Sequence, residues 1–304
     1  MSQKLKEALR EDLTPAELQY LVQSYDVVGD IAIIIIPQEL VKKEHLIASA
    51  ILNLHRNIKV VAKRAGIYGG EFRTLPLQII GGEERKETLH TEDGVRFLVN
   101  PETVYFSVRS SNERKRIASL VHAGEEILVL FSGIGPYPLI IGRANPSCRL
   151  LGIEINPEAH RYALKNLVYN KKITNVRFLE GDAGSVLPAL KRKFDRIVMP
   201  LPKSAEAFLF VALAALRQEG WLHFYDLQQE NRFSDSVDKV DTACQRAARQ
   251  LLSSAVTVCG HCAPRTYRIC VDARIGKLLG PPHLKERQEY FKDNEKDDIP
   301  FNPQ

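Results

Sequence analysis

The chain has 304 residues, of which 44% are hydrophobic and 26% are charged. This composition is typical of a globular protein large enough for one or two domains. There is no apolar run of about 18 residues or more, and residues 1–12 are polar with mixed charge, which argues against a membrane span and a secretory signal. We therefore expect a soluble, cytoplasmic protein without a membrane partner. The net charge of +5 permits a nucleic-acid partner but does not require one.

The cysteines indicate free thiols. Their number, five, is odd, and a disulfide framework is uncommon in a chain of this length. The run Cys259-Gly260-His261-Cys262 has a spacing that a metal or a redox pair could use. Because no second Cys/His pair accompanies it, the pattern favours a free pair in an edge hairpin, and we expect no metal.

The first third of the chain predicts a smaller α+β domain over residues 1–105. Residues 30–36 and 59–63 are short β-branched, apolar runs typical of strands, and they flank a helical stretch near 42–54. Further strand-like runs cover 75–80 and 95–99.

Residues 106–276 predict a Rossmann-like α/β domain. Apolar strand runs near 125–133, 149–155, 175–182 and 194–202 alternate with helical stretches, and a helix over 204–218 precedes a strand over 220–227. This alternation is typical of a doubly wound, mostly parallel sheet. Two last runs, 254–259 and 267–273, predict an antiparallel edge hairpin. Residues 277–304 are polar and charged, and we expect a disordered tail.

A glycine loop follows the first strand of the predicted parallel sheet. In Phe131-Ser132-Gly133-Ile134-Gly135 the two glycines let the backbone approach a ligand. A dinucleotide fingerprint would place a third glycine where the chain has Pro138, so the pattern disfavours NAD. A tight turn without a ligand would explain the two glycines equally well.

Two acidic residues favour a nucleoside site at this loop. Glu154 ends the second strand and Asp182 ends the third, and open α/β sheets bind ligands at the carboxyl ends of their strands. One carboxylate suits the ribose hydroxyls and the other suits the adenine amino group. The set describes an adenosine site without a pyrophosphate, which fits S-adenosylmethionine as cofactor. Taken singly, each acid could be a helix cap.

The fourth strand ends at a stiff turn that contains Pro200 and Pro202. Such a turn could form a rigid wall for a flat substrate. It could equally be a strand terminator before the next helix.

One segment carries a specific resemblance. The sequence YFSVRSSNER (residues 105–114) resembles the YFSPRLxxER motif of the archaeal and eukaryotic tRNA guanine-N1 methyltransferases that act at position 37. The chain is similar to the same family at SYDVVGDIAII, GGEFRTLPLQIIGGEE, FSGIGPY and MPLPKSA, so the likeness spans about residues 20–275. Transferases of the wybutosine pathway share this scaffold.

The resemblance implies roles for individual residues. Glu113 would be the general base that removes the N1 proton, and Arg73 would face the guanine O6, where negative charge develops. Tyr105 and Arg109 would position the flipped base beside Pro200. The implied cofactor contacts are Arg114, Phe131, Gly133, Gly135, Glu154, Ile155, Asp182 and Ala183. Without the resemblance, Glu113 and Arg114 would pass for a solvated charge pair on a helix.

Two departures from the family pattern keep other functions open. Pro200 stands where relatives that act on guanine N1 commonly have asparagine, and Val129 replaces an aspartate usual before the glycine loop. The main expectation is methyl transfer from S-adenosylmethionine to N1 of guanosine 37 in tRNA, by an RNA-binding protein for which a monomer is favoured. The alternatives are a wybutosine-pathway transfer of a methyl or aminocarboxypropyl group to a modified guanosine, and a catalytically silent tRNA-binding homologue.

Overall fold

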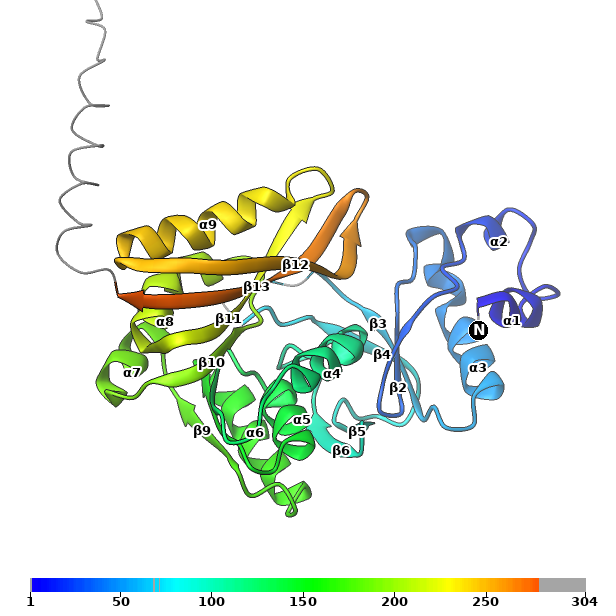
Figure 1. Cartoon of the computed structure of the whole chain (residues 1–304). Helices are drawn as coiled ribbons and strands as arrows, with labels where there is room; N and C mark the ends of the chain where they lie inside the picture. Colours follow the sequence, from blue (N-terminus) through cyan, green and yellow to red (C-terminus); the bar gives the residue numbers. More distant parts are fainter. Residues whose placement is uncertain (1, 68, 71, 279–304) are drawn as a thin grey trace, which may run out of the picture. The chain divides into compact units, whose positions relative to one another are not determined.

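The computed structural model describes residues 2–67, 69–70 and 72–278 (Figure 1). Its contacts divide the chain into two units, Met1–Glu125 with Val129–Ala183, and Glu126–Leu128 with Gly184–Gln304. Of the tail expected over 277–304, residues 279–304 lie outside the described part, whereas the last strand continues through Leu278. In the described residues no helix is both long and apolar enough to cross a membrane.

The first 105 residues form helices and two small sheets, and one apolar core joins α1, α3 and the four-stranded sheet. A four-stranded sheet has the order β1-β2-β3-β4, in which β2 and β3 are parallel, and β5 pairs with β6 separately. Helix α3 buries Ile47, Ala48 and Ile51, a spacing that places them on one face, and Leu5 and Leu9 join the same core. The elements, with η for a 3-10 helix, are α1 (Ser2–Ala8), α2 (Glu17–Tyr20), β1 (Asp26–Val28), β2 (Ile31–Ile34), η1 (Gln38–Lys43), α3 (Glu44–Leu54), β3 (Val60–Arg64), β4 (Leu77–Gly82), β5 (Thr88–Glu92) and β6 (Val95–Val99).

The rest of the chain builds a seven-stranded sheet with the order β12-β13-β11-β10-β7-β8-β9. Strand β7 contributes residues to both units, and all five of its side chains are buried, as expected for a strand covered on both faces. The elements are η2 (Val108–Ser110), α4 (Ser111–Ser119), β7 (Glu126–Leu130), α5 (Pro136–Ala144), β8 (Arg149–Glu154), α6 (Pro157–Tyr169), β9 (Val176–Glu180), α7 (Ala183–Leu190), β10 (Phe194–Met199), η3 (Ala205–Phe208), α8 (Leu209–Ala215), β11 (Leu216–Gln229), α9 (Phe233–Arg246), β12 (Arg249–Ala263) and β13 (Thr266–Leu278).

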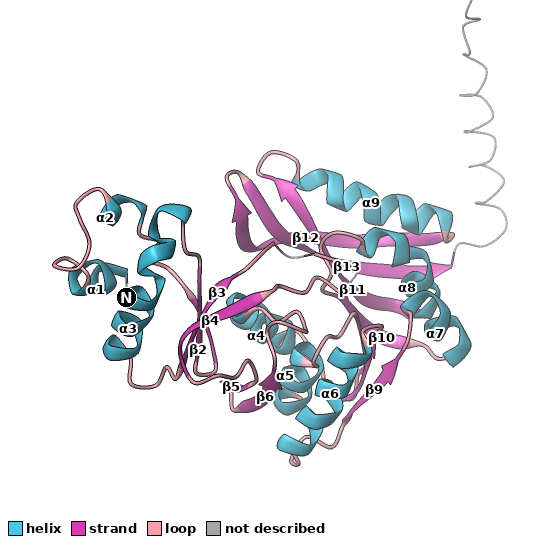
Figure 2. Ribbon diagram, turned by 180° about the vertical axis from the view of Figure 1, so that it is seen from behind, coloured by secondary structure: helices cyan, strands magenta, loops and turns pink. Residues whose placement is uncertain are grey.

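The predicted fold class is confirmed. Strands β8 and β9 are parallel, as are β10 and β11, while β13 pairs antiparallel with both β11 and β12. Within the second unit, α9 runs along the β12 and β13 hairpin (Figure 1). Within the first unit, α5 and α6 lie beside the β5 and β6 pair (Figure 2).

The helix predicted over residues 204–218 is shorter in the structure. It consists of η3 and α8 and ends at Ala215, and β11 begins at Leu216. The residues after Ala215 favour a helix by propensity, but Leu216 pairs with Phe194 of β10, and this tertiary pairing overrides local preference.

Candidate functional site

The glycine loop between β7 and α5 is held in a backbone conformation that needs its glycines. Phe131, Gly133 and Gly135 have φ angles of 56°, 57° and 89°. A Cβ at Gly135 would lie 2.5 Å from Cζ of Phe178, so a side chain there would be both strained and blocked. The Ser132 amide donates to the Ile153 carbonyl at 3.0 Å, which ties the loop to β8.

Glu154 ends β8 with its carboxylate directed at this loop. Oε2 accepts a hydrogen bond from the Gly133 amide at 2.6 Å, and Oε1 accepts one from the Asn156 amide at 2.9 Å. Burial raises the pKa of the Glu154 carboxyl, although the amide donors act in the opposite direction. A carboxylate offers about four lone-pair sites, so each oxygen can accept a further hydroxyl donor.

The end of β9 lies beside the end of β8. The Gly181 amide donates to the Glu154 carbonyl at 2.8 Å, and Asp182 follows directly, before α7 begins at Ala183. Ala183 is buried and Ile155 is exposed. The structure therefore brings the expected nucleoside contacts of three neighbouring strands to one sheet edge, in the order that the sequence suggested.

The motif at residues 105–114 packs against both the N-terminal sheet and the glycine loop. The Tyr105 carbonyl oxygen lies 3.9 Å from the position that a Cβ of Gly133 would occupy. The Arg73 guanidinium lies 5.9 Å from the centre of the Tyr105 ring, which is 43% exposed. Arg109 donates to Asp26 of β1 at 2.7 Å. Arg73 and Tyr105 thus come together from separate segments, whereas Arg109 pairs with Asp26 of β1.

Glu113 and Arg114 lie in the first turn and a half of α4 and are buried, with exposed fractions of 5% and 2%. They are not a solvated pair. Both Glu113 oxygens accept from Arg116, at 2.8 and 2.7 Å. Arg114 donates from Nε to Glu92 of β5 at 2.7 Å and from Nη2 to the Ser107 carbonyl at 3.1 Å. The second Arg114–Glu92 bond, from Nη2, makes this a bidentate buried ion pair.

Pro200 and Pro202 belong to the second unit. They follow β10, and both are half-buried. The Leu201 amide donates to the Met199 carbonyl at 2.8 Å, which makes the segment a tight turn at the carboxyl end of the strand.

Two family matches cover most of the chain. Residues 88–252 match the TRM5/TYW2 methyltransferase domain, and residues 5–85 match the TYW2 N-terminal domain. The chain belongs to the TRM5/TYW2 methyltransferase family.

Similar proteins carry related names. The chain is 33% identical over 263 residues to a protein of Pyrococcus abyssi named tRNA (guanine(37)-N(1))-methyltransferase Trm5b, covering 86% of this chain and 78% of that one. It is 29% identical to Taw22 of Nanoarchaeum equitans, named as a tRNA (guanine(37)-N(1))/4-demethylwyosine(37)-methyltransferase, covering 82% and 98%. A solved complex of aTrm5 with tRNALeu superposes with a TM-score of 0.73 and 29% identity, covering 90% of this chain and 76% of that chain.

Sequence reasoning missed a buried polar cluster in this TRM5/TYW2 chain. His223 of β11 has no exposed surface. Its Nε2 atom lies 2.6 Å from Nη1 of Arg196, and its Nδ1 atom lies 2.5 Å from Oδ1 of Asp272. Arginine has only donors, so Nε2 must accept and Nδ1 must carry the proton given to Asp272. Cys270 also donates to Asp272, at 3.3 Å. These three potential metal ligands, His223, Cys270 and Asp272, are therefore held in a hydrogen-bonded network.

The sequence signal for that cluster was weak, because polar residues within apolar strand runs do not show which partners they meet across the sheet. The CGHC run that the sequence did single out lies near the end of β12. There Cys262 is exposed, and Cys259 donates to the Thr257 carbonyl at 3.3 Å. Both are free thiols, as predicted.

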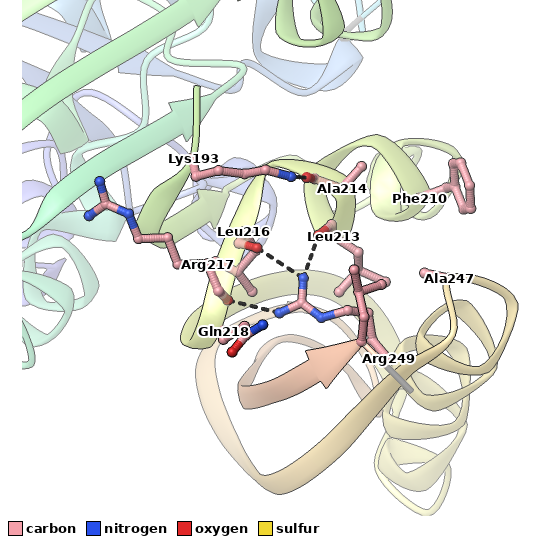
Figure 3. A pocket seen from close by; sticks show the side chains of 10 residues that line it. Lys193, Phe210, Leu213, Ala214, Leu216, Arg217, Gln218, Ala247 and Arg249 are labelled. Atoms are coloured by element: carbon pink, nitrogen blue, oxygen red, sulfur yellow. Dashed lines mark hydrogen bonds between the residues drawn. The ribbon is translucent and has the colours of Figure 1, made fainter. Parts of the chain in front are cut away.

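A cavity of about 430 Å³ in the second unit contains none of the predicted site residues (Figure 3). Arg249 lines this cavity and donates to the carbonyls of Leu213 and Leu216 at 2.8 and 2.9 Å. The same guanidinium reaches the Arg217 carbonyl at 2.8 Å, and Lys193 donates to the Ala214 carbonyl. These cations satisfy carbonyls of the last turn of α8 and of the first two residues of β11, which is a structural role.

Proposed function

We propose that this protein transfers a methyl group from S-adenosylmethionine to N1 of guanosine 37 in tRNA. The observation that carries the proposal is the convergence at the glycine loop. The Glu154 carboxylate accepts from the Gly133 amide of that loop, and the carbonyl oxygen of Tyr105, the first residue of the motif, lies 3.9 Å from the position of a Gly133 Cβ. Membership of a methyltransferase family and the named relatives supply the reaction class.

The cofactor fits the residues that are present. Gly133 leaves its backbone open, since only the Tyr105 carbonyl lies within 4 Å of the position of a Cβ there, and the Glu154 carboxylate is fixed where ribose hydroxyls could donate to it. Ile155, Asp182 and Ala183 would contact the adenine. When bound, S-adenosylmethionine supplies an electrophilic methyl group on a sulfonium.

The chain's own residues would prepare the guanine for attack. Glu113, oriented by Arg116, would accept the N1 proton as the bond from N1 to the methyl carbon forms and the bond from sulfur to that carbon breaks. Arg73 would stabilise the negative charge that develops on O6, and the exposed Tyr105 face would stack on the base. Arg114 would complete the cofactor side of the site, and Arg109 would help to position the base. Roles for Pro200 and Pro202 in binding the base stay predictions that rest on the resemblance of their segment to the family.

A second candidate is transfer to a modified guanosine at the same position. It is favoured by the match of residues 5–85 to the TYW2 N-terminal domain and by the 4-demethylwyosine activity in the name of Taw22. Pro200 adds to it, because proline cannot supply the amide donor that an asparagine would offer to guanine.

The test is incubation with S-adenosylmethionine and tRNA that carries guanosine, adenosine or 4-demethylwyosine at position 37, followed by nucleoside mass spectrometry. A single added methyl on the guanosine tRNA alone supports the main proposal. Product on the 4-demethylwyosine tRNA alone, with the mass of a methyl or of an aminocarboxypropyl group, replaces it with the second. Binding of tRNA without any product would indicate a catalytically silent homologue.

We also propose that the protein acts as a cytoplasmic monomer, with an N-terminal domain over residues 1–105 and a catalytic domain over 106–276. Light scattering during size-exclusion chromatography would test the monomer.

A further inference from the structure

A basic groove lies at the end of α5 and α6 that points away from the glycine loop. We use this name for the pocket lined by Arg96, Arg143, Lys171 and Lys172 with Val168 and Tyr169. Its volume is about 420 Å³, within the range of small-ligand sites. Arg143 is in the last turn of α5, and the two lysines follow Asn170, the C-cap residue of α6.

The two arginines of the groove are held in place by the fold. The Arg96 amide donates to Asn170 Oδ1 at 3.0 Å, and Asn170 Nδ2 donates back to the Arg96 carbonyl at 2.7 Å. The Arg96 guanidinium lies 5.7 Å over the Tyr169 ring and donates to the Tyr169 carbonyl at 2.7 Å. Gly94 has φ 72°, and a Cβ there would lie 2.6 Å from Nη2 of Arg143, so the turn accommodates that guanidinium closely. Preorganised cations lose less entropy when they bind.

The positive charge of the groove is not neutralised by carboxylates. The acidic residues of the adjoining β5–β6 turn are engaged elsewhere, Glu92 with Arg114 at 2.7 Å and Asp93 with Lys115 at 2.6 Å. Within the described ranges, no carboxylate lies within ion-pair distance of Arg143, Lys171 or Lys172. Cations also offset helix dipoles, but the carboxyl ends of two helices contribute only about half a negative charge each. After this offset, the four cations of the groove still carry a net charge of roughly +3.

We propose that the basic groove binds phosphate groups of the tRNA backbone, an inference that rests on the proposed function. All four cations are exposed, and Arg96 already lies over the Tyr169 ring, an arrangement that suits a chain of phosphates better than an enclosed nucleotide. From Gly135 to Arg143 the helix rises by about 12 Å at about 1.5 Å per residue. That is roughly three to four steps of about 3.4 Å along a nucleic-acid strand. Contacts of this kind set the register of the RNA and do not read its bases.

The experiment compares Lys171→Glu/Lys172→Glu with a control of equal charge change, Lys6→Glu/Lys277→Glu, whose lysines are exposed and lie outside the groove. The affinity for tRNA is measured from about 50 to 200 mM salt. The groove variant should bind about ten-fold more weakly, and its slope of log affinity against log salt should fall by about 1 to 2. In methylation assays its KM for tRNA should rise more than its kcat falls. The control should match wild type.

Other outcomes would overturn the inference. A groove variant whose affinity and salt slope equal those of the control would show that no phosphate is bound there. Inorganic phosphate that raises the melting temperature of wild type but not of the groove variant, with tRNA affinity unchanged, would assign the groove to a free anion. Wild type that binds tRNA without methylating it would refute the proposed function alone, while a weaker groove variant would still support the groove. Wild type that binds no tRNA would refute both.

Discussion

Replacing Glu92 by glutamine tests whether the buried pair with Arg114 holds the motif helix in place. Arg114 is 2% exposed, and its Nε and Nη2 both donate to Glu92. Glutamine keeps one acceptor oxygen but presents an NH2 group to a guanidinium that has only donors. The variant therefore leaves a buried cation with neither a counter-charge nor a complete set of acceptors.

The expected loss is large for a single substitution. Breaking one side of a buried ion pair costs about 3–5 kcal/mol, which at an unfolding entropy of about 2.1 cal/mol/K per residue lowers the melting temperature of a chain of this size by roughly 5–8 °C. The double variant Glu92→Leu/Arg114→Met should lose less than Glu92→Gln, because an apolar pair leaves no uncompensated charge. The affinity for S-adenosylmethionine should fall in both variants if Arg114 contacts the cofactor.

Thermal unfolding followed by circular dichroism measures the effect. The matched control is Glu158→Gln, which breaks the exposed pair with Arg161 on α6 and should cost less than about 1 kcal/mol. A melting temperature of the Glu92 variant within about 2 °C of the control, a difference of no more than roughly 1 kcal/mol, would refute the reasoning.

Three further predictions concern the glycine loop and the thiols. Glu154→Gln should weaken S-adenosylmethionine binding, because its amide has one acceptor oxygen where the carboxylate accepts from both Gly133 and Asn156. Burial raises the pKa of Glu154 and its charged form opposes folding, so the stability of wild type without cofactor should fall as the pH rises from the unfolded pKa through the raised folded pKa, and the variant should lack this fall. Calorimetry and unfolding scans against pH check both, and an equal pH dependence in the two proteins would contradict the sign. Gly135→Ala should cost about 1–3 kcal/mol, since its Cβ would meet Phe178 at 2.5 Å in left-handed backbone. Denaturant titration measures it, and an unchanged midpoint would count against the blocked geometry. Native protein should react with a thiol reagent at exposed Cys262 and not at Cys244, where burial raises the pKa to about 12. Peptide mass spectrometry locates the label, and rapid labelling of Cys244 in the folded state would contradict its burial.

Much of the candidate site was predictable from local patterns. Apolar runs marked β7, β8 and β9, and the carboxyl ends of parallel strands meet at one edge, so Glu154 and Asp182 could be placed beside the glycine loop before any coordinates. The strands could be recognised in the sequence because strands buried on both faces are continuously apolar.

Other features depend on which strands become neighbours. The start of β11 at Leu216 follows from pairing with Phe194, which local helix propensity opposes. Glu113 and Arg114 read as a solvated pair in sequence, yet Arg114 is buried because β5, more than 20 residues earlier, supplies Glu92.

The sequence by itself determined the alternation of strands and helices from β7 to β10, the ligand-binding edge of the sheet and the residue types along it, since these follow from periodicity and from glycine and proline chemistry. Only the tertiary structure decided that Arg73 meets Tyr105, that His223 is fixed between Arg196 and Asp272, and that four cations share one groove. Each of these depends on contacts between segments distant in sequence, which no local pattern encodes.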